Sequence, residues 1–218
     1  MILRRKQIKD DNPDKNPVNI LVIADEQVQS FYSDYEEKHR VFDGIDLIIS
    51  CGDLSPHYLS FIADAAHCNV LYVNGNHHCD KDEEHLGCLS IDGTLSVHKG
   101  IRILGLGGSM KYKDCGAPAM YTEEEMVKRV KKLRNTIKKA GGFDILVTHS
   151  PAFGINDGTD LPHTGFKVFN ELLEEYKPKY FLHGHIHNNY GTYKQKTEHN
   201  ETLIINAHRR VNFIYTFD

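Results

Sequence analysis

Seven side chains of types that bind metal ions or transfer protons each follow an apolar segment of the chain. They are Asp25, Asp53, Asn76, His77, His149, His185 and His187. A mixture of carboxylate and amide oxygens with imidazole nitrogens suits Mn, Fe or Zn, and it differs from the thiolate set of a structural zinc. The chain also has 14 His against 10 Phe and 11 Tyr, and histidine is the commonest metal ligand. The residue types therefore indicate metal-dependent chemistry.

Asp53 has the chemistry of a bridging ligand. Its carboxylate has two oxygens and a negative charge, so it can contact two cations and offset their mutual repulsion. Asn76 offers a neutral amide oxygen in addition. His185 and His187 follow Gly184 and are separated by one residue, so we expect a loop that directs the two rings to adjacent metal ions.

The apolar segments before these residues are predicted to be strands buried on both faces, because they contain unbroken apolar runs. They cover residues 19–24, 46–50, 69–73, 144–148 and 180–182. Ligands of α/β sheets bind beyond the carboxyl ends of the strands, which is where the seven side chains fall. Helices are predicted between the strands, at about residues 28–42, 56–67, 122–140 and 165–176.

The third helix has the clearest boundaries. Thr122 and Glu125 form a capping-box pattern at its start, and Gly141 is predicted to end it. A strand-like block lies before this helix, at residues 95–106, and three further strands are expected at 190–196, 201–207 and 210–217, arranged as an antiparallel meander. Strands that alternate with helices and end in a meander indicate an α/β layered domain.

Length and composition favour one ordinary globular domain. The chain has 218 residues, of which we expect 1–17 to be a polar leader with a short edge strand at its start and 18–218 to be a single domain. The 26 Lys and Arg against 30 Asp and Glu give a net charge of -4, which argues against a general polyanion binder. The five cysteines are scattered, and no apolar stretch reaches the roughly 18 residues of a membrane span, so we expect a cytoplasmic protein.

In sequence order, the strand-end motifs resemble those of the calcineurin-like metallophosphoesterase family. The stretch from Gly165 to Gly191, in which Lys177-Pro178 follows a predicted helix, also resembles its small bacterial members. The matching pieces are Asp25, Gly52-Asp53, Gly75-Asn76-His77, Thr148-His149-Ser150 and Gly184-His185-Ile186-His187. They run from residue 25 to residue 187, so the resemblance covers most of the chain. It implies a four-layer α-β-β-α sandwich, with two mixed sheets face to face and helices outside.

The resemblance also implies a dinuclear centre that hydrolyses a small phosphorylated substrate, either a phosphomonoester or a phosphodiester. The first metal would be bound by Asp25, Asp53 and His187, and the second by Asp53, Asn76, His149 and His185. Two divalent ions, with Mn preferred over Fe, Zn or Ni, would supply a metal-bound hydroxide for in-line attack on phosphorus. His77 would be the general acid that protonates the leaving oxygen.

Two positions depart from the family pattern. The family has a histidine two residues after the first aspartate, where this chain has Gln27, so the first metal site is expected to be weaker if the amide oxygen is the ligand. Gln27 is otherwise an ordinary loop residue. His78 stands where the family has an acid that orients the general acid, and it is a further candidate for metal or substrate contact.

Two other functions remain open from the sequence. One is a binding or scaffold protein on the same fold with little catalysis, and the other is a nuclease. Six of the family's seven ligand positions are filled, which favours the enzyme, and the net charge of -4 argues against nucleic acid as a partner. Substrate selection is expected from loops over the metals, including residues 152–164 with Asp157, Asp160 and His163. Neither the substrate nor an oligomeric state follows from these patterns.

Overall fold

Two large β-sheets form the centre of the protein. The computed structural model describes residues 12–31, 40–77, 85–113, 119–187 and 194–218. The first sheet has the order β13-β1-β2-β3-β4, in which β1 to β4 are parallel and β13 is antiparallel to β1. Its strands are β1 (Val18–Ala24), β2 (Leu47–Ser50), β3 (Asn69–Tyr72), β4 (Cys88–Ser90) and β13 (Arg209–Tyr215).

The second sheet has the order β11-β12-β10-β9-β6-β5. Its four central strands are parallel, and β11 and β5 are antiparallel strands at the edges. Its strands are β5 (Thr94–His98), β6 (Ile101–Leu106), β9 (Ile145–Thr148), β10 (Tyr180–His183), β11 (Lys196–His199) and β12 (Thr202–Asn206). Two short strands, β7 (Ser109–Met110) and β8 (Met120–Tyr121), pair with each other.

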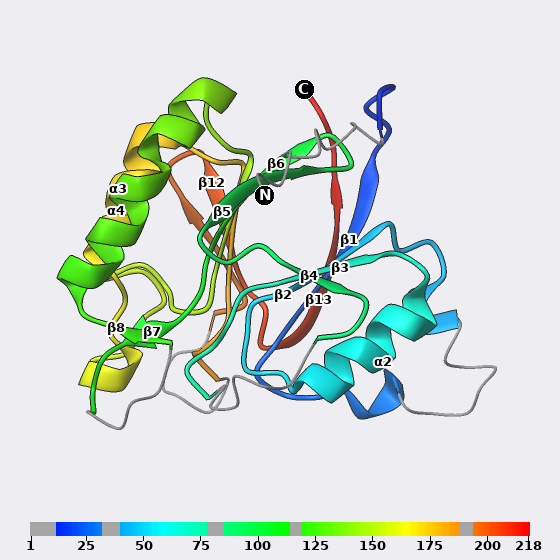
Figure 1. Ribbon diagram of the computed structural model, residues 1–218, viewed down its shortest axis with the longest axis horizontal. Helices are drawn as coiled ribbons and strands as arrows, with labels where there is room; N and C mark the ends of the chain where they lie inside the picture. Colours follow the sequence, from blue (N-terminus) through cyan, green and yellow to red (C-terminus); the bar gives the residue numbers. More distant parts are fainter. Residues whose placement is uncertain (1–11, 32–39, 78–84, 114–118, 188–193) are drawn as a thin grey trace, which may run out of the picture.

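The helices cover the outer faces of both sheets. α2 (Pro56–Ala66) lies outside the first sheet, whereas α3 (Glu123–Ala140) and α4 (Lys167–Tyr176) lie outside the second (Figure 1). Three apolar clusters fill the interfaces, one between the sheets and one beneath each helical layer. The predicted α/β four-layer sandwich is therefore confirmed. None of the helices in the described ranges is both long and apolar enough to cross a bilayer.

The five strands predicted before the polar clusters are confirmed as β1, β2, β3, β9 and β10. The predicted C-terminal meander is wrong in its topology. β11 and β12 do form an antiparallel pair, but β12 also pairs in parallel with β10, and the chain then crosses to the other sheet, where β13 pairs with β1. Local alternation of apolar residues predicts strands, but it does not predict which sheet each strand joins.

Of the remaining predicted elements, the strand expected at 190–196 falls partly on residues 190–193, which lie outside the described residues, and β11 begins only at Lys196. The block at 95–106 is a hairpin of β5 and β6. The predicted helix at 28–42 contributes a short 3-10 turn, η1 (Gln29–Phe31), and helical residues 40–42, while 32–39 lie outside the described residues. The edge strand predicted at the start of the leader also lies outside them. Asn12 joins the end of the leader to the fold, because its amide donates to the carbonyl of Lys99 (3.2 Å).

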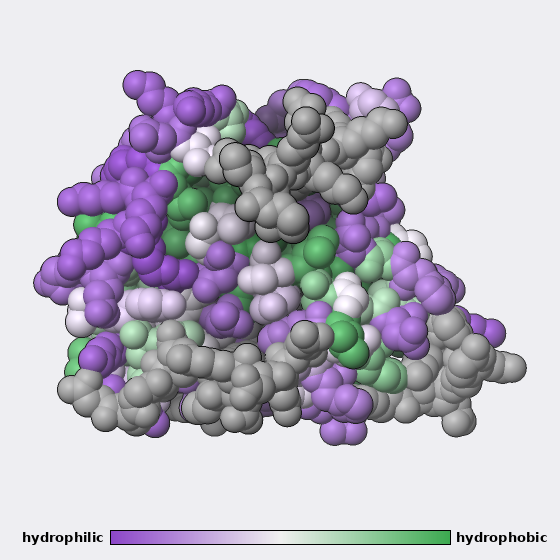
Figure 2. All heavy atoms as spheres, in the orientation of Figure 1, coloured by the Kyte–Doolittle hydropathy of each residue, from purple (hydrophilic) through white to green (hydrophobic). Residues whose placement is uncertain are grey.

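The helix α3 has the caps that its sequence predicts. The Thr122 hydroxyl accepts from Glu125 N (3.2 Å), and the Glu125 carboxylate accepts from Thr122 N (2.8 Å), which completes the capping box. Gly141 ends the helix in the left-handed conformation with φ of 72°. The outer surface over α3 is hydrophilic (Figure 2), so its lysines form a solvated helix face.

We predict that Thr122→Ala lowers the free energy of unfolding by about 1 kcal/mol, because it removes an N-cap acceptor. Thr136→Ala is the matched control, since Thr136 is exposed within the same helix and Ala has the higher helix propensity. Urea unfolding of both variants measures the difference. Equal stability changes in the two variants would contradict a role of the cap.

Candidate metal centre

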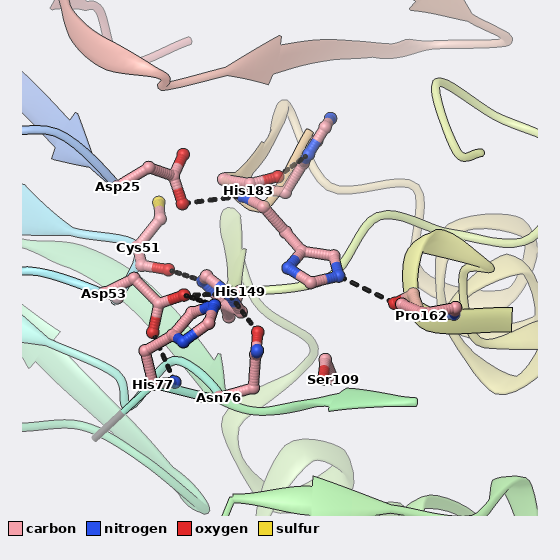
Figure 3. A network of polar contacts seen from close by, with 12 residues as sticks. Asp25, Cys51, Asp53, Asn76, His77, Ser109, His149, Pro162 and His183 are labelled. Atoms are coloured by element: carbon pink, nitrogen blue, oxygen red, sulfur yellow. Dashed lines mark hydrogen bonds and ion pairs between the residues drawn. The ribbon is translucent and has the colours of Figure 1, made fainter. Parts of the chain in front are cut away.

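The predicted site residues gather at the carboxyl ends of strands from both sheets. Asp25 follows β1, Asp53 follows β2 and Asn76 follows β3, while His149 follows β9 and His185 follows β10. Because the two sheets lie face to face, these strand ends meet at one edge of the sandwich (Figure 3). The structure therefore brings together residues that are up to 160 positions apart in the sequence.

Three electron-pair donors converge around His149. Its Nε2 lies 3.0 Å from Asn76 Oδ1 and 3.1 Å from Asp53 Oδ2. Its Nδ1 lies 2.8 Å from the carbonyl oxygen of Cys51, which can only accept, so Nδ1 carries the proton and Nε2 faces the two oxygens. Ligands of one ion at about 2.1 Å lie about 3.0–3.4 Å apart, which matches these spacings. The cluster therefore fits a divalent cation.

The charge on this cluster favours a cation as well. Burial alone would lower the pKa of His149, but the charge of Asp53, its hydrogen bond to the ring and the charge of Asp25 raise that pKa to about 9. The side chains of His149 and Asp53 are 0% and 9% exposed, so water screens this attraction poorly. A positive charge at this point, whether proton or metal ion, stabilises two buried carboxylates.

His185 is the third side chain of the group that contains Asp53 and His149. Its Nε2 donates to the carbonyl of Pro162 (2.8 Å), which leaves Nδ1 as the nitrogen with a lone pair. Burial, and then the charge of His149, lower the pKa of His185 to about 3, so the ring is neutral as a metal ligand must be. Asp53, His149 and His185 each offer a ligand atom, and these atoms lie within 4.8 Å of one another.

Asp25 lies in a separate group with His187 and His208, whose ligand atoms also lie within 4.8 Å of one another. Asp25 Oδ1 accepts from the backbone N–H of His185 (2.9 Å), which links the two groups. Burial would raise the pKa of Asp25, but His208, His149 and this N–H together lower it, so the carboxylate stays charged. Burial lowers the pKa of His187 and keeps that ring neutral.

The backbone at three of these residues adopts an unusual conformation. Asp25, Asp53 and His185 have φ of 67°, 57° and 69°, in the left-handed region that L residues with a side chain rarely occupy. Residues held this way cluster at functional sites, because surrounding packing must hold them there. At Gly52, with φ of 101°, a Cβ would lie 2.8 Å from His149 Nδ1, so a side chain would displace that ring.

His77 is placed differently from the buried ligands. Its backbone N–H donates to Asp53 Oδ1 (2.9 Å), and its side chain is 74% exposed with Nε2 4.0 Å from Asp53 Oδ2. The ring therefore stands beside the cluster and can reach a bound molecule. Gln27 is exposed, and its amide donates to Ser55 Oγ (3.4 Å) at the start of α2. His78 lies outside the described residues.

The loop at 152–164 reaches the site through its backbone and one ring. Pro162 supplies the carbonyl bound by His185, and the His163 ring centre lies 5.2 Å from that of His185. The carboxylate of Asp160 is 2.8 Å from His163 Nδ1. Asp157 instead accepts from the backbone of Gly165 (3.1 Å), so it supports the loop.

His208 is the residue that the sequence analysis missed. It follows the apolar strand β12, and that position is the same signal that identified the other residues. The expected meander excluded His208 as a candidate, because the carboxyl end of an antiparallel strand would lie at the opposite edge of the sheet from the other site residues. The parallel pairing of β12 with β10 directs its carboxyl end to the edge that holds the site.

Comparison with known proteins identifies the family and the fold. The calcineurin-like phosphoesterase superfamily domain matches residues 19–207. No curated protein matches the chain. Among solved structures, TT1561 of Thermus thermophilus is 14% identical with a TM-score of 0.63, and the alignment covers 89% of this chain and 90% of that protein.

Two further solved structures are similar in fold. The phosphopantetheinyl hydrolase PptH from Mycobacterium tuberculosis is 12% identical with a TM-score of 0.56, over 89% of this chain and 90% of that protein. GAP50, the anchor in the inner membrane complex of Plasmodium, is 10% identical with a TM-score of 0.50, over 87% of this chain and 71% of that protein. The match over residues 19–207 shows that this chain belongs to the calcineurin-like phosphoesterase superfamily, a family of metal-dependent phosphoester hydrolases.

Proposed function

We propose that this protein hydrolyses a small phosphorylated molecule, a phosphomonoester or a phosphodiester, at a centre of two divalent metal ions. The observation that carries the proposal is the convergence of His149 Nε2, Asn76 Oδ1 and Asp53 Oδ2, with the ring nitrogen within 3.1 Å of both oxygens, beside the exposed ring of His77. Oxygen and imidazole ligands without thiolates make Mn²⁺ the preferred ion.

Each ligand residue has a distinct task in this proposal. Asn76, His149 and His185 would hold one ion, Asp25 and His187 would hold the other, and Asp53 has the charge and the second oxygen to contact both. Ions bound there would neutralise charge on the phosphoryl oxygens and lower the pKa of a water nucleophile. The carbonyls of Cys51 and Pro162 fix the imidazole tautomers that make this binding possible.

His77 is the proposed proton donor to the leaving oxygen. A general acid must reach the substrate, and the His77 ring is exposed, whereas those of His149 and His185 are buried. Asp53, whose Oδ2 lies 4.0 Å from His77 Nε2, supplies a negative charge beside the ring.

A pocket next to the metal centre suggests the kind of substrate. It has a volume of about 460 Å³, which suits a small molecule, and His208, Arg209 and Arg210 are among its lining residues. Arg210 lies over the ring of Phe31 (5.6 Å), and no carboxylate of the described residues forms an ion pair with it. We therefore propose a substrate with a second anionic group, which Arg210 would bind.

A binding protein on the same fold is the second candidate. Gln27 in place of a family histidine favours it, since a lost ligand weakens a metal site. GAP50 shares the fold and is described as an anchor. Measured metal content and turnover separate the two candidates, because a binding protein needs neither.

We predict that Asp53→Asn abolishes metal-dependent hydrolysis of p-nitrophenyl phosphate and its bis ester. The loss should exceed about 100-fold, because even outer-shell substitutions cost about 10–100-fold. Asp64→Asn on the exposed face of α2 is the matched control and should retain wild-type turnover. Assays with and without Mn²⁺, together with circular dichroism, measure the effect. Unchanged turnover in a folded Asp53→Asn protein would refute the dinuclear mechanism.

We also predict that Arg210→Gln weakens inhibition by pyrophosphate about fivefold to tenfold, or about 1–1.4 kcal/mol, because one charge contact is lost. The KM for p-nitrophenyl phosphate, which has no second anionic group, should change much less. Inhibition constants for pyrophosphate and phosphate measure the difference, with Lys138→Gln on α3 as the control. An equal change in the inhibition constants of pyrophosphate and phosphate would show that Arg210 contributes only long-range electrostatic attraction and does not contact the second anionic group.

A further inference from the structure

The first metal group contains a histidine that no family motif includes. The His208 side chain is 2% exposed, and its Nδ1 lies 3.6 Å from Asp25 Oδ2. The ring stacks on that of His187, with ring centres 4.6 Å apart and planes at 26°. One ligand atom from each of Asp25, His187 and His208 lies within 4.8 Å of the others.

The position of His208 is fixed by the backbone. It lies in the crossing between β12 and β13, where Ala24, the last residue of β1, bridges to it. Its N–H donates to Asn206 Oδ1 (3.0 Å), and the Asn206 amide in turn donates to the carbonyl of Ile186 (2.8 Å). The same contacts therefore connect His208 to the strand before Asp25 and to the loop that bears His187.

The orientation of the ring suits a ligand. Nδ1 faces Asp25, whereas Nε2 faces the carboxylate of Glu26, whose Oε1 is 3.7 Å away. Arg209 Nε lies 3.9 Å from the other oxygen of Glu26. Each ring nitrogen therefore has a carboxylate at a similar distance. With a cation between Nδ1 and Asp25, the proton of the ring would belong on Nε2, where Glu26 faces it, as in carboxylate–histidine–metal arrangements. The lone pair of Nδ1 would then point to the ion.

The Asp25 carboxylate also has a property expected of a metal ligand. Its side chain is 0% exposed, and within the described residues its Oδ2 has no hydrogen-bond partner, because 3.6 Å to His208 exceeds hydrogen-bond length. A buried carboxylate oxygen without a donor is costly. The spacing of 3.6 Å is close to that of two ligands on one ion, about 3.0–3.4 Å.

We infer that His208 is a ligand of the first metal ion and supplies the imidazole that the family obtains from the position of Gln27. This inference rests on the proposed dinuclear centre and adds a ligand to it. The amide of Gln27 contacts Ser55 at the start of α2, whereas His208 faces Asp25 and His187. The first site thus has Asp25, His187 and His208 as its terminal protein ligands.

The test measures bound Mn²⁺ per chain by equilibrium dialysis in four proteins, namely the wild type, His208→Gln, Gln27→Ala and His57→Gln. His57 is an exposed histidine of α2 and controls for loss of a histidine. We expect two ions in the wild type and in both comparison variants. His208→Gln should keep one ion, with the other bound at least about tenfold more weakly.

The outcomes separate this inference from the proposed function. Two ions with unchanged affinities in His208→Gln would refute the inference and leave the dinuclear centre intact. Loss of an ion in Gln27→Ala instead of His208→Gln would also refute it, in favour of the amide. Fewer than two ions in the wild type would refute both proposals. The single ion retained by His208→Gln also shows that the variant is folded.

Crystals of the wild type grown with Zn²⁺ test the same point without a substitution. Anomalous scattering locates each ion, and His208 Nδ1 should lie about 2.0–2.1 Å from the ion bound by Asp25. An ion at Asp25 with His208 beyond bonding distance would refute the inference, even if the variant proteins did not fold.

Discussion

The structure depends on two negative charges, those of Asp25 and Asp53, placed at facing strand ends with side chains that are 0% and 9% exposed. Buried carboxylates are costly unless a positive charge compensates them. The described partners of Asp25 are histidine side chains and a backbone N–H rather than lysine or arginine. Burial keeps two neighbouring rings, His185 and His187, neutral. The charges of the two carboxylates raise the pKa of His149 to about 9, so a proton on that ring or a metal ion in its place compensates them.

The sandwich makes this arrangement stable. Each ligand follows a strand whose residues are buried against apolar layers, so the ends of the strands cannot easily move apart. That packing also holds Asp25, Asp53 and His185 in the left-handed conformation. The backbone at Gly184 also lies close to the Asp25 carboxylate, because a Cβ on Gly184 would lie 3.1 Å from both carboxylate oxygens. Core packing and metal affinity are therefore coupled in this fold.

Most of the strands and most of the candidate ligands could be predicted from the sequence. An unbroken apolar run that ends in Asp, Asn or His indicates a buried strand, and it also places the polar residue at the carboxyl end of that strand. The α3 caps were predictable for a similar reason, since Thr122, Glu125 and Gly141 act through local contacts. The path of the C-terminal strands was not predictable, because strand pairing depends on contacts between distant segments. That single error concealed His208, whose relevance depends on the parallel pairing of β12 and β10.

The position of His208 also changes how a departure from the family pattern should be interpreted. Counting motif positions treats Gln27 as a lost ligand, which would favour a binding protein. In three dimensions the first site borders both the end of β1 and the crossing from β12 to β13, which are joined at Ala24 and His208. His208 in that crossing can therefore offer an imidazole to the same site as Asp25 and His187. A substitution in one motif is evidence for a lost metal site only when no other segment offers a ligand at that site. In this protein the segment between β12 and β13 offers His208.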